Sequence, residues 1–273
     1  MFEGLKTGCR AALFLMVGAL LATSGLSGTA ARAADRIKLG VMAGEEEEIA
    51  EVAKKVAARD GLDVQLVTFQ DYTMPNAALE SGDLDANAFQ HKPYLDAQIR
   101  DRGYHIVPIG FTIVEPIGLY SRKVKKLDEL KSGARIGIPN DPSNGARSLN
   151  LLAANGVLTL APGKGLSPSV LDIASNPKNL KFVGLDAAQL PRSLQDLDAA
   201  VINTNYVLST GLDPVKDALV QESWTDNPYG NFIATREKDK DRPDLKKLVA
   251  AYESDEVKEF LKTRFKGAIL PAW

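Results

Sequence analysis

The feature that most restricts the fold of this chain is a regular alternation of short apolar segments with amphipathic segments. Residues 36–42 (RIKLGVM) are predicted to form a buried strand, residues 45–61 carry apolar side chains at helical spacing, and residues 62–69 (LDVQLVTF) alternate as a second strand does. A strand–helix–strand succession of this kind places its strands parallel in one sheet, with helices over the faces. The sequence therefore predicts an α/β fold.

The same succession begins a second time near the middle of the chain. Residues 134–141 (ARIGIPND) are predicted to form a strand, and residues 143–156 a helix with Ser143 as its N-cap. The tetrapeptide Asp-Leu-Asp-Ala also occurs twice, at residues 83–86 and 196–199. Two copies of one plan predict two similar lobes, joined by strands that cross between them.

Each Asp-Leu-Asp-Ala repeat is predicted to begin a strand, with its leucine and alanine toward the core and its aspartates at the exposed end. Polar and aromatic residues follow both copies, as NAFQHKPY and as VINTNY. Ligands of parallel sheets bind outside the carboxyl ends of the strands, so we expect these residues to line a cleft between the lobes. A tetrapeptide of this kind is also a common polar turn without function, and that alternative stays open.

The first 33 residues have the three parts of a secretory signal peptide. Lys6 and Arg10 come before the apolar run 11–22, and small residues then lead to an Ala-x-Ala site that ends at Ala33. A helix that spans a bilayer needs about 20 apolar residues, more than this run provides. We therefore expect residues 1–33 to be cleaved and the mature protein to be exported.

The mature chain that this cleavage would leave is mildly acidic and has no cysteine. The whole chain has a net charge of −2, and the leader carries Lys6, Arg10 and Arg32 against Glu3, a net charge of +2, so the mature chain has −4. This balance gives no reason to expect a nucleic-acid partner. Cys9, the only cysteine, precedes the apolar run, so the mature chain has no disulfide or thiol chemistry.

No motif in the chain points to catalysis or to a cofactor. The sequence has no G-x-S-x-G elbow, no P-loop and no G-x-G-x-x-G, and His91 and His105 lack the spacing of a metal-ligand pair. Four consecutive glutamates, residues 45–48, are interpreted as a favourable acidic helix start rather than as a metal site. We therefore expect no enzyme activity, no metal and no cofactor.

The residue types near the predicted strand ends suit ligand binding. Aromatic rings can contact an apolar part of a ligand, and amides can hydrogen-bond to its polar part. These residues are Tyr72, Phe89, Tyr94, Tyr206, Asn144, Asn203, Asn205 and Asn231. Arg147 lies in the first turns of a predicted helix, where its forked guanidinium could hold a carboxylate with two bonds. The alternative, a solvated Arg147 on the helix surface, stays open.

Several longer segments resemble the NlpA/MetQ family of periplasmic methionine-binding proteins, which serve ABC importers. They follow one another in order over nearly the whole mature chain: NAFQHKPYLD, EPIGLYS, IPNDPSNGARSLNLL, AAVINTNY and NPYGNFIATRE. The resemblance implies a two-lobed, type II periplasmic binding protein fold that closes around one amino acid in a cleft between the lobes. We assign residues 34–118 and 228–273 to the first lobe and residues 119–227 to the second.

The resemblance, carried over position by position, also implies roles for nine residues. Arg147, helped by Asn144, would bind the ligand's carboxylate, and Glu115 would be the partner of its ammonium group. Asn203 and Asn231 would hold the polar backbone groups of the ligand. The pocket for its thioether side chain would be formed by Tyr72, Phe89, His91 and Tyr94.

Many members of the family are lipoproteins with a cysteine at the cleavage site, where this chain has Ala33 and Ala34. We therefore expect a monomer that diffuses freely in the periplasm and delivers methionine or a related small amino acid to an inner-membrane ABC permease with its ATPase. Alternatives that stay open are D-methionine, another apolar amino acid or a short methionine-containing peptide as the ligand. An enzyme on the same fold and a surface protein with a vestigial cleft are further alternatives.

Overall fold

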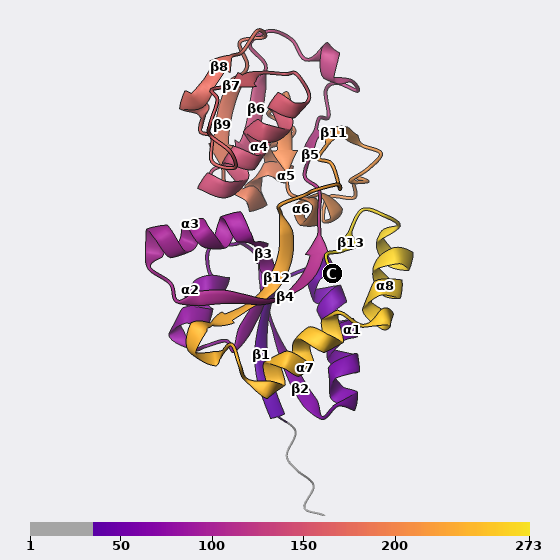
Figure 1. The fold of residues 1–273 in the computed structure, drawn as a ribbon. Coiled ribbons are helices and arrows are strands. Elements are labelled where there is room, and N and C mark those ends of the chain that lie inside the picture. The colour runs from indigo at the N-terminus through magenta and orange to yellow at the C-terminus, as the bar shows by residue number, and fades with distance from the viewer. Residues whose placement is uncertain (1–34) are drawn as a thin grey trace, which may run out of the picture. The chain divides into compact units, whose positions relative to one another are not determined.

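Two separate β-sheets, each covered by helices, form the framework of the protein in the computed structural model, which describes residues 35–273 (Figure 1). The predicted signal peptide, residues 1–33, lies outside the described residues. Within residues 35–273, no helix has the length and apolar character needed to cross a membrane.

The first lobe is built on a six-stranded sheet in the order β13-β4-β12-β3-β1-β2. Strands β1, β2 and β3 run parallel, whereas β12 is antiparallel to both of its neighbours and β13 is antiparallel to β4. The strands of this sheet are β1 (Asp35–Met42), β2 (Leu62–Phe69), β3 (Ala86–His91), β4 (Ile106–Val114), β12 (Gly230–Arg236) and β13 (Leu270–Pro271).

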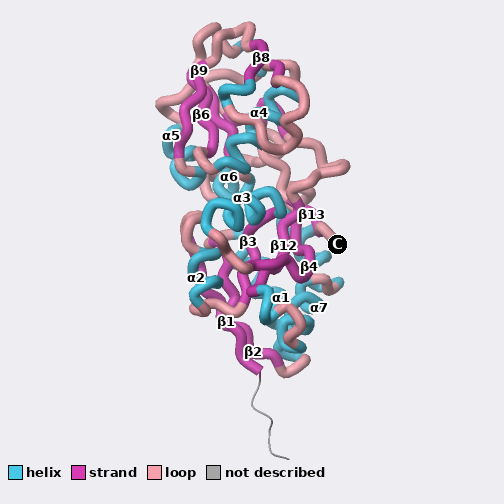
Figure 2. The backbone as a smooth tube through the Cα atoms, turned by 60° about the vertical axis from the view of Figure 1, so that its left-hand side comes forward, coloured by secondary structure: helices cyan, strands magenta, loops and turns pink. Residues whose placement is uncertain are grey.

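Helices cover both faces of this sheet (Figures 1 and 2). One face carries α1 (Glu45–Arg59), α7 (Pro243–Tyr252) and α8 (Asp255–Phe265), and the other carries α2 (Pro75–Ser81) and α3 (Lys92–Arg102). The apolar side chains of α1 recur at helical spacing, and Ile49, Ala53 and Ala57 are all buried against the strands. This burial of one helix face is the main source of stability for an amphipathic helix.

The second lobe is built on a five-stranded sheet in the order β11-β5-β10-β6-β9. Helix α4 (Pro142–Ala154) packs on one face, and α5 (Leu190–Ser193) and α6 (Thr204–Leu208) pack on the other. The strands are β5 (Gly118–Tyr120), β6 (Arg135–Pro139), β9 (Lys181–Leu185), β10 (Ala199–Ile202) and β11 (Ala218–Gln221), beside a small pair of β7 (Thr159–Leu160) and β8 (Ile173–Ser175). Short 3₁₀ turns are η1 (Leu127–Glu129), η2 (Val170–Asp172), η3 (Ala187–Gln189) and, in the first lobe, η4 (Glu237–Asp239).

The chain passes between the two sheets twice. Residues 115–117 connect β4 with β5, and residues 222–229 connect β11 with β12. These two crossing segments are hydrogen-bonded to each other, because the backbone N–H of Glu222 donates to the carbonyl oxygen of Ile117 at 2.9 Å. The predicted lobe limit after residue 118 falls inside β5, all of which belongs to the second sheet, and the limit after residue 227 falls just before β12.

The two Asp-Leu-Asp-Ala repeats occupy equivalent places in the two lobes. Strands β3 and β10 begin only at the alanine of each repeat, so the aspartates precede the strand. The carboxylate of Asp85 accepts from the backbone N–H of Lys38 at 2.8 Å, and that of Asp198 accepts from Arg135 at the same distance. Each repeat therefore ties its own strand to the neighbouring strand, β1 or β6, and has a structural role.

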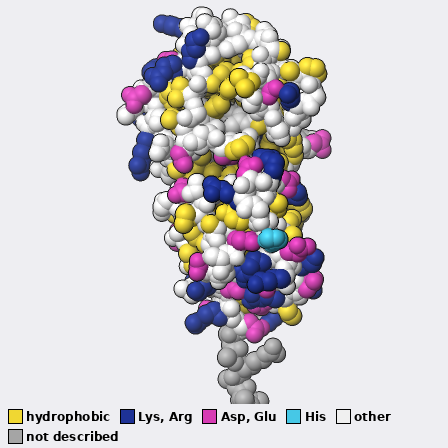
Figure 3. Space-filling view, turned by 90° about the vertical axis from the view of Figure 1, so that its left-hand side faces the viewer, with side chains coloured by type: hydrophobic (Ala, Val, Ile, Leu, Met, Phe, Trp, Pro, Cys, Tyr) yellow, Lys and Arg dark blue, Asp and Glu magenta, His cyan; other side chains and the backbone are white. Residues whose placement is uncertain are grey.

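Charges of both signs lie side by side on the surface (Figure 3). Exposed ion pairs include Arg36 with Asp63 and Arg264 with Glu48, both with N–O distances of 2.7 Å. Exposed pairs of this kind contribute about 0–1 kcal/mol each to stability. The fold is therefore held mainly by the buried cores of its two lobes.

Candidate ligand-binding site

All nine residues that the resemblance implied line one pocket between the two sheets. The first lobe and its crossing segment contribute Tyr72, Phe89, His91, Tyr94, Glu115 and Asn231, and the second lobe contributes Asn144, Arg147 and Asn203. Three lining residues were not predicted, namely Glu46, Gln90 and Thr204. The structure thus brings the predicted set together, while contact of each residue with a ligand stays a prediction.

One end of the pocket is aromatic. The ring centroids of Tyr72, Phe89 and Tyr94 lie 5.8–6.0 Å apart in tilted and edge-on arrangements. The hydroxyl groups of the two tyrosines already have partners. Tyr72 donates to the side-chain oxygen of Asn205 at 2.6 Å, and Tyr94 donates to the carbonyl oxygen of Tyr72 at 2.9 Å. Ring faces and edges therefore line this end of the pocket, and such a lining suits an apolar or thioether group of a ligand. Phe89 lies within β3, not beyond its end as the sequence suggested.

His91 links the two lobes as a neutral ring. It is the last residue of β3 and the N-cap of α3, and its Nδ1 accepts from the backbone N–H of Tyr94. Burial, together with the nearby charge of Arg147, lowers the pKa of His91 to about 3. Because Nδ1 is an acceptor, the ring proton is on Nε2, which donates to the Oδ1 atom of Asn144 at 3.3 Å.

The start of α4 positions two polar pocket residues of the second lobe, Asn144 and Arg147. Asp141, and not the predicted Ser143, is the N-cap, and its carboxylate accepts from the backbone N–H of Asn144 at 2.8 Å. Asn144 and Arg147 are three residues apart, so they lie on the same side of the helix. The Oδ1 atom of Asn144 also accepts from the amide of Asn203 at 3.0 Å. Asn144 is therefore largely occupied in holding its neighbours.

Arg147 is buried, with 2% of its surface exposed, which excludes the solvated alternative. Its Nε and Nη2 atoms donate to the carboxylate of Glu222, and Nη2 also donates to the carbonyl oxygen of Glu115 at 2.9 Å. The guanidinium lies 4.1 Å from the centre of the Tyr229 ring. These contacts use Nε and Nη2 and leave Nη1 as the nitrogen that can meet a ligand. Sequence reasoning missed Glu222 and Tyr229, because nothing in the sequence relates them to a residue on α4.

Two buried acceptors in the pocket have no partner within the described part of the chain. They are the Oε1 atom of Glu115 and the Oδ1 atom of Asn203, on residues that are 8% and 7% exposed. A buried polar atom without a hydrogen bond costs about 1–3 kcal/mol. The pocket therefore offers two acceptors near a guanidinium donor, an arrangement that suits a ligand carrying both N–H donors and a carboxylate.

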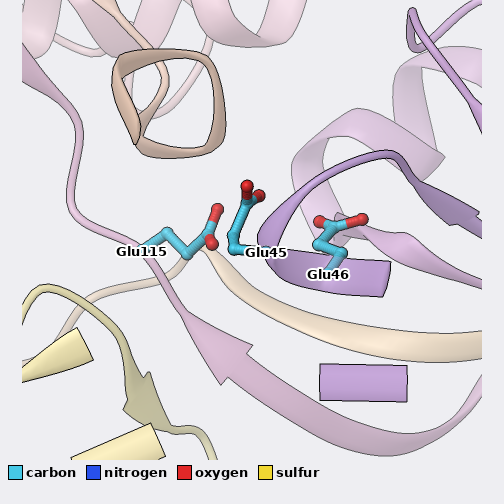
Figure 4. A group of neighbouring side chains, drawn as sticks. All are labelled: Glu45, Glu46 and Glu115. Atoms are coloured by element: carbon cyan, nitrogen blue, oxygen red, sulfur yellow. The ribbon is translucent and has the colours of Figure 1, made fainter. Parts of the chain in front are cut away.

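Glu45 and Glu46, at the start of α1, are turned inward beside Glu115 (Figure 4). Carboxylate oxygens of the three residues lie within 4.8 Å of one another, a spacing that also suits a cation. Burial and mutual repulsion raise the pKa of Glu45 and of Glu46 well above the usual value. Burial raises the pKa of Glu115 to about 7, although Arg147 acts in the opposite direction. The helix-start interpretation of residues 45–48 was therefore incomplete. Their place directly after a parallel strand, β1, was the available signal.

Comparison with known proteins identifies the family of this chain. The family model described as NlpA lipoprotein matches residues 37–273. The chain belongs to the NlpA lipoprotein family. The resemblance inferred from the sequence segments is thereby confirmed.

Relatives in the NlpA family match this chain over most of its length. The D-methionine-binding lipoprotein MetQ of Salmonella typhimurium is 53% identical over 265 residues, which cover 95% of this chain and 97% of that protein. A solved nutrient binding protein from Burkholderia cenocepacia, bound to methionine, is 56% identical with a TM-score of 0.85, covering 87% of this chain and 100% of that one. An ABC transporter, periplasmic substrate-binding protein from Coxiella burnetii is 51% identical with a TM-score of 0.84, and the match covers 86% of this chain and 100% of that one. The predicted two-lobed periplasmic binding protein fold is confirmed.

Proposed function

We propose that this protein is the substrate-binding component of an ABC importer and that it captures methionine between its two lobes. The observation that carries the proposal is the division of one buried pocket into a polar half around Arg147 and Glu115 and an aromatic half around Tyr72 and Phe89. A similar division exists in methionine itself, which joins an amino-acid head to an apolar thioether. The methionine bound in the Burkholderia cenocepacia relative supports the same ligand here.

Each half of the ligand has a chemical counterpart in the pocket. The carboxylate would accept hydrogen bonds from Nη1 of Arg147 and from the amide of Asn231, and charge-assisted bonds of this kind are the stronger ones. The ammonium group would donate to the unpartnered oxygens of Glu115 and Asn203. The thioether would pack among the four residues of the aromatic half, Tyr72, Phe89, His91 and Tyr94.

Capture of the ligand would favour the closed arrangement of the lobes. Arg147 and Asn203 belong to the second lobe, whereas Tyr72 and Asn231 belong to the first, so one bound molecule contacts both. A ligand shifts a conformational equilibrium only by its difference in affinity for the two states. A methionine that bridges the lobes has this difference, and the permease with its ATPase would then recognise the closed monomer.

The choice between related ligands can be tested directly. Native mass spectrometry of the purified protein, before and after unfolding to release bound molecules, should show one methionine per chain, of either hand. If another apolar amino acid or a short peptide were released, that molecule would replace methionine as the proposed ligand. Conversion of an added amino acid into a new product by the purified protein would contradict a purely binding role, which the names of the relatives support.

We also propose that the mature protein is released into the periplasm without a lipid anchor. The Salmonella typhimurium relative is named a lipoprotein, but the one cysteine of this chain, Cys9, precedes the apolar run instead of following it. Labelling cells with radioactive palmitate should leave this protein unlabelled and recover it in the soluble periplasmic fraction. Incorporation of the label would overturn this part of the proposal.

A further inference from the structure

Three buried carboxylates on two separate segments meet beside the pocket. Glu45 and Glu46 begin α1, Glu115 lies on the first crossing segment, and their oxygens come within 4.8 Å of one another (Figure 4). Exposed fractions of 4%, 5% and 8% leave these groups almost no contact with water. Like charges this close, in surroundings that exclude water, cannot all be ionised together, so at least one carboxyl group of this cluster holds a proton.

The acceptors around the cluster are only partly used. The carboxylate of Glu46 accepts from the backbone N–H of Met42 at 3.0 Å, but one oxygen of Glu45 and one of Glu115 have no partner within the described residues. Outside the cluster, the buried Oδ1 atom of Asn203 lines the same pocket and is unpartnered too. Three buried oxygens without a partner suit a ligand group that is rich in N–H donors.

We propose that Glu45, Glu46 and Glu115 form one buried subsite for the ammonium group of the ligand, which enters in exchange for a proton. This inference rests on the proposed function, because it assigns the amino end of the proposed ligand. The only covalent bond that breaks is the O–H bond of one carboxyl group. A carboxyl group of the cluster releases its proton to the solvent, and the carboxylate so formed accepts a hydrogen bond from the incoming ammonium group.

The surroundings of the cluster favour this exchange. Burial raises the pKa of Glu45 and of Glu46 well above the usual value and that of Glu115 to about 7, so Glu115 can release a proton near neutral pH. An ammonium group placed between the carboxylates would favour their ionised forms. Other titratable groups that act on the cluster or are acted on by it are Glu48, Arg147, Arg264, Tyr72, Tyr206 and Tyr252.

A monovalent ammonium group fits the site better than a divalent metal ion. Glu115 lies beside Arg147, whose fixed positive charge lowers the pKa of Glu115 and would oppose a second, double positive charge. The subsite should therefore select primary amines, and a methionine that lacks its amino group or carries an N-acetyl group should bind far more weakly.

The test is a count of the protons released when methionine binds. Calorimetric titrations in phosphate and in imidazole at about pH 6.5 differ by the heat of buffer protonation, which gives that count. We expect about one proton released per methionine by the wild-type protein, and an affinity that rises on the order of tenfold per pH unit below neutrality. Glu45→Gln removes one titrating group and should release clearly fewer protons.

Glu47→Gln is the matched control, because it makes the same substitution in the same helical turn outside the cluster. It should release as many protons as the wild type. Methionine binding without proton release, or equal release by Glu45→Gln and the wild type, would overturn the inference and leave the proposed function standing. If calcium instead raised the melting temperature of the wild type but not that of Glu45→Gln, that result would overturn the inference of an ammonium subsite in favour of a metal site. Absence of any methionine binding would overturn both.

Discussion

At the scale of single residues, Arg147 is central because it joins the pocket to both crossing segments. Arg147→Ala should weaken methionine binding by at least about tenfold, since it removes the donor for the ligand's carboxylate and leaves Glu222 without its cation. The affinity of Arg147→Lys for methionine should lie between those of the wild type and Arg147→Ala, because a lysine keeps the charge but not the forked geometry. Calorimetry measures these affinities. Arg192→Ala, on the exposed surface of α5, is the control and should bind as the wild type does. An Arg147→Ala variant within about twofold of the wild type would refute this role.

His91 makes a pH-dependent contribution to stability. Its folded-state pKa is about 3, whereas an unfolded histidine titrates near pH 6.5, so unfolding takes up a proton between these values. Its contribution is therefore fully present above about pH 6.5 and is lost as the pH falls toward 3. The raised pKa of Glu115 acts in the opposite sense between about 4.5 and 7, so the wild-type curve alone is ambiguous.

The variant His91→Gln isolates this contribution, because glutamine keeps an N–H donor and does not titrate. Thermal melting at several pH values should show a smaller loss of stability on acidification in His91→Gln than in the wild type. Identical losses in the two proteins would show that His91 is not held neutral by its surroundings.

At the scale of elements, the position of α4 against β6 sets the polar half of the pocket. A Cβ atom added at Gly145 would lie 2.9 Å from the carbonyl oxygen of Pro139, so Gly145→Ala must push the helix away from the strand. Alanine normally favours a helix over glycine by about 1 kcal/mol, but here we expect a lower melting temperature and weaker methionine binding. Gly184→Ala, whose Cβ would meet only ordinary contacts at 3.6 Å, is the control. A stabilised Gly145→Ala variant would contradict this view of the helix.

Elements with strong local signals were the ones that the sequence predicted well. The predicted strand 62–69 coincides with β2, and the helical spacing of residues 45–61 coincides with α1, which ends at Arg59, because each has a clear apolar period and a defined end. Strands such as β7 and β8 were not predicted, since their short, half-exposed segments carry little pattern.

The site could be predicted only as far as a family pattern or a strand end indicated it. Phe89, Asn203 and Arg147 were found in this way, and all line the pocket. The pairing of Arg147 with Glu222 and the inward turn of Glu45 toward Glu115 depend on how segments far apart in the sequence pack together. Local sequence carries no record of contacts between residues that distant, so reasoning from the sequence did not reach them.

At the scale of the whole molecule, the two crossing segments couple the pocket to the relation between the lobes. Arg147 bonds to the backbone of Glu115 on one segment and to the side chain of Glu222 on the other. Contacts such as Tyr72 with Asn205 and His91 with Asn144 also join the lobes directly around the pocket. A ligand held by Arg147 would therefore act on the two segments that connect the lobes.

The central claim is that this pocket binds one methionine, and calorimetric titration tests it most directly. The protein would first be unfolded and refolded to remove any molecule carried through purification. Addition of methionine should then give a single saturating transition with one molecule bound per chain, and the same titration with Arg147→Ala should be at least about tenfold weaker. Absence of binding heat at several temperatures, together with an unchanged melting temperature at saturating methionine, would contradict the claim.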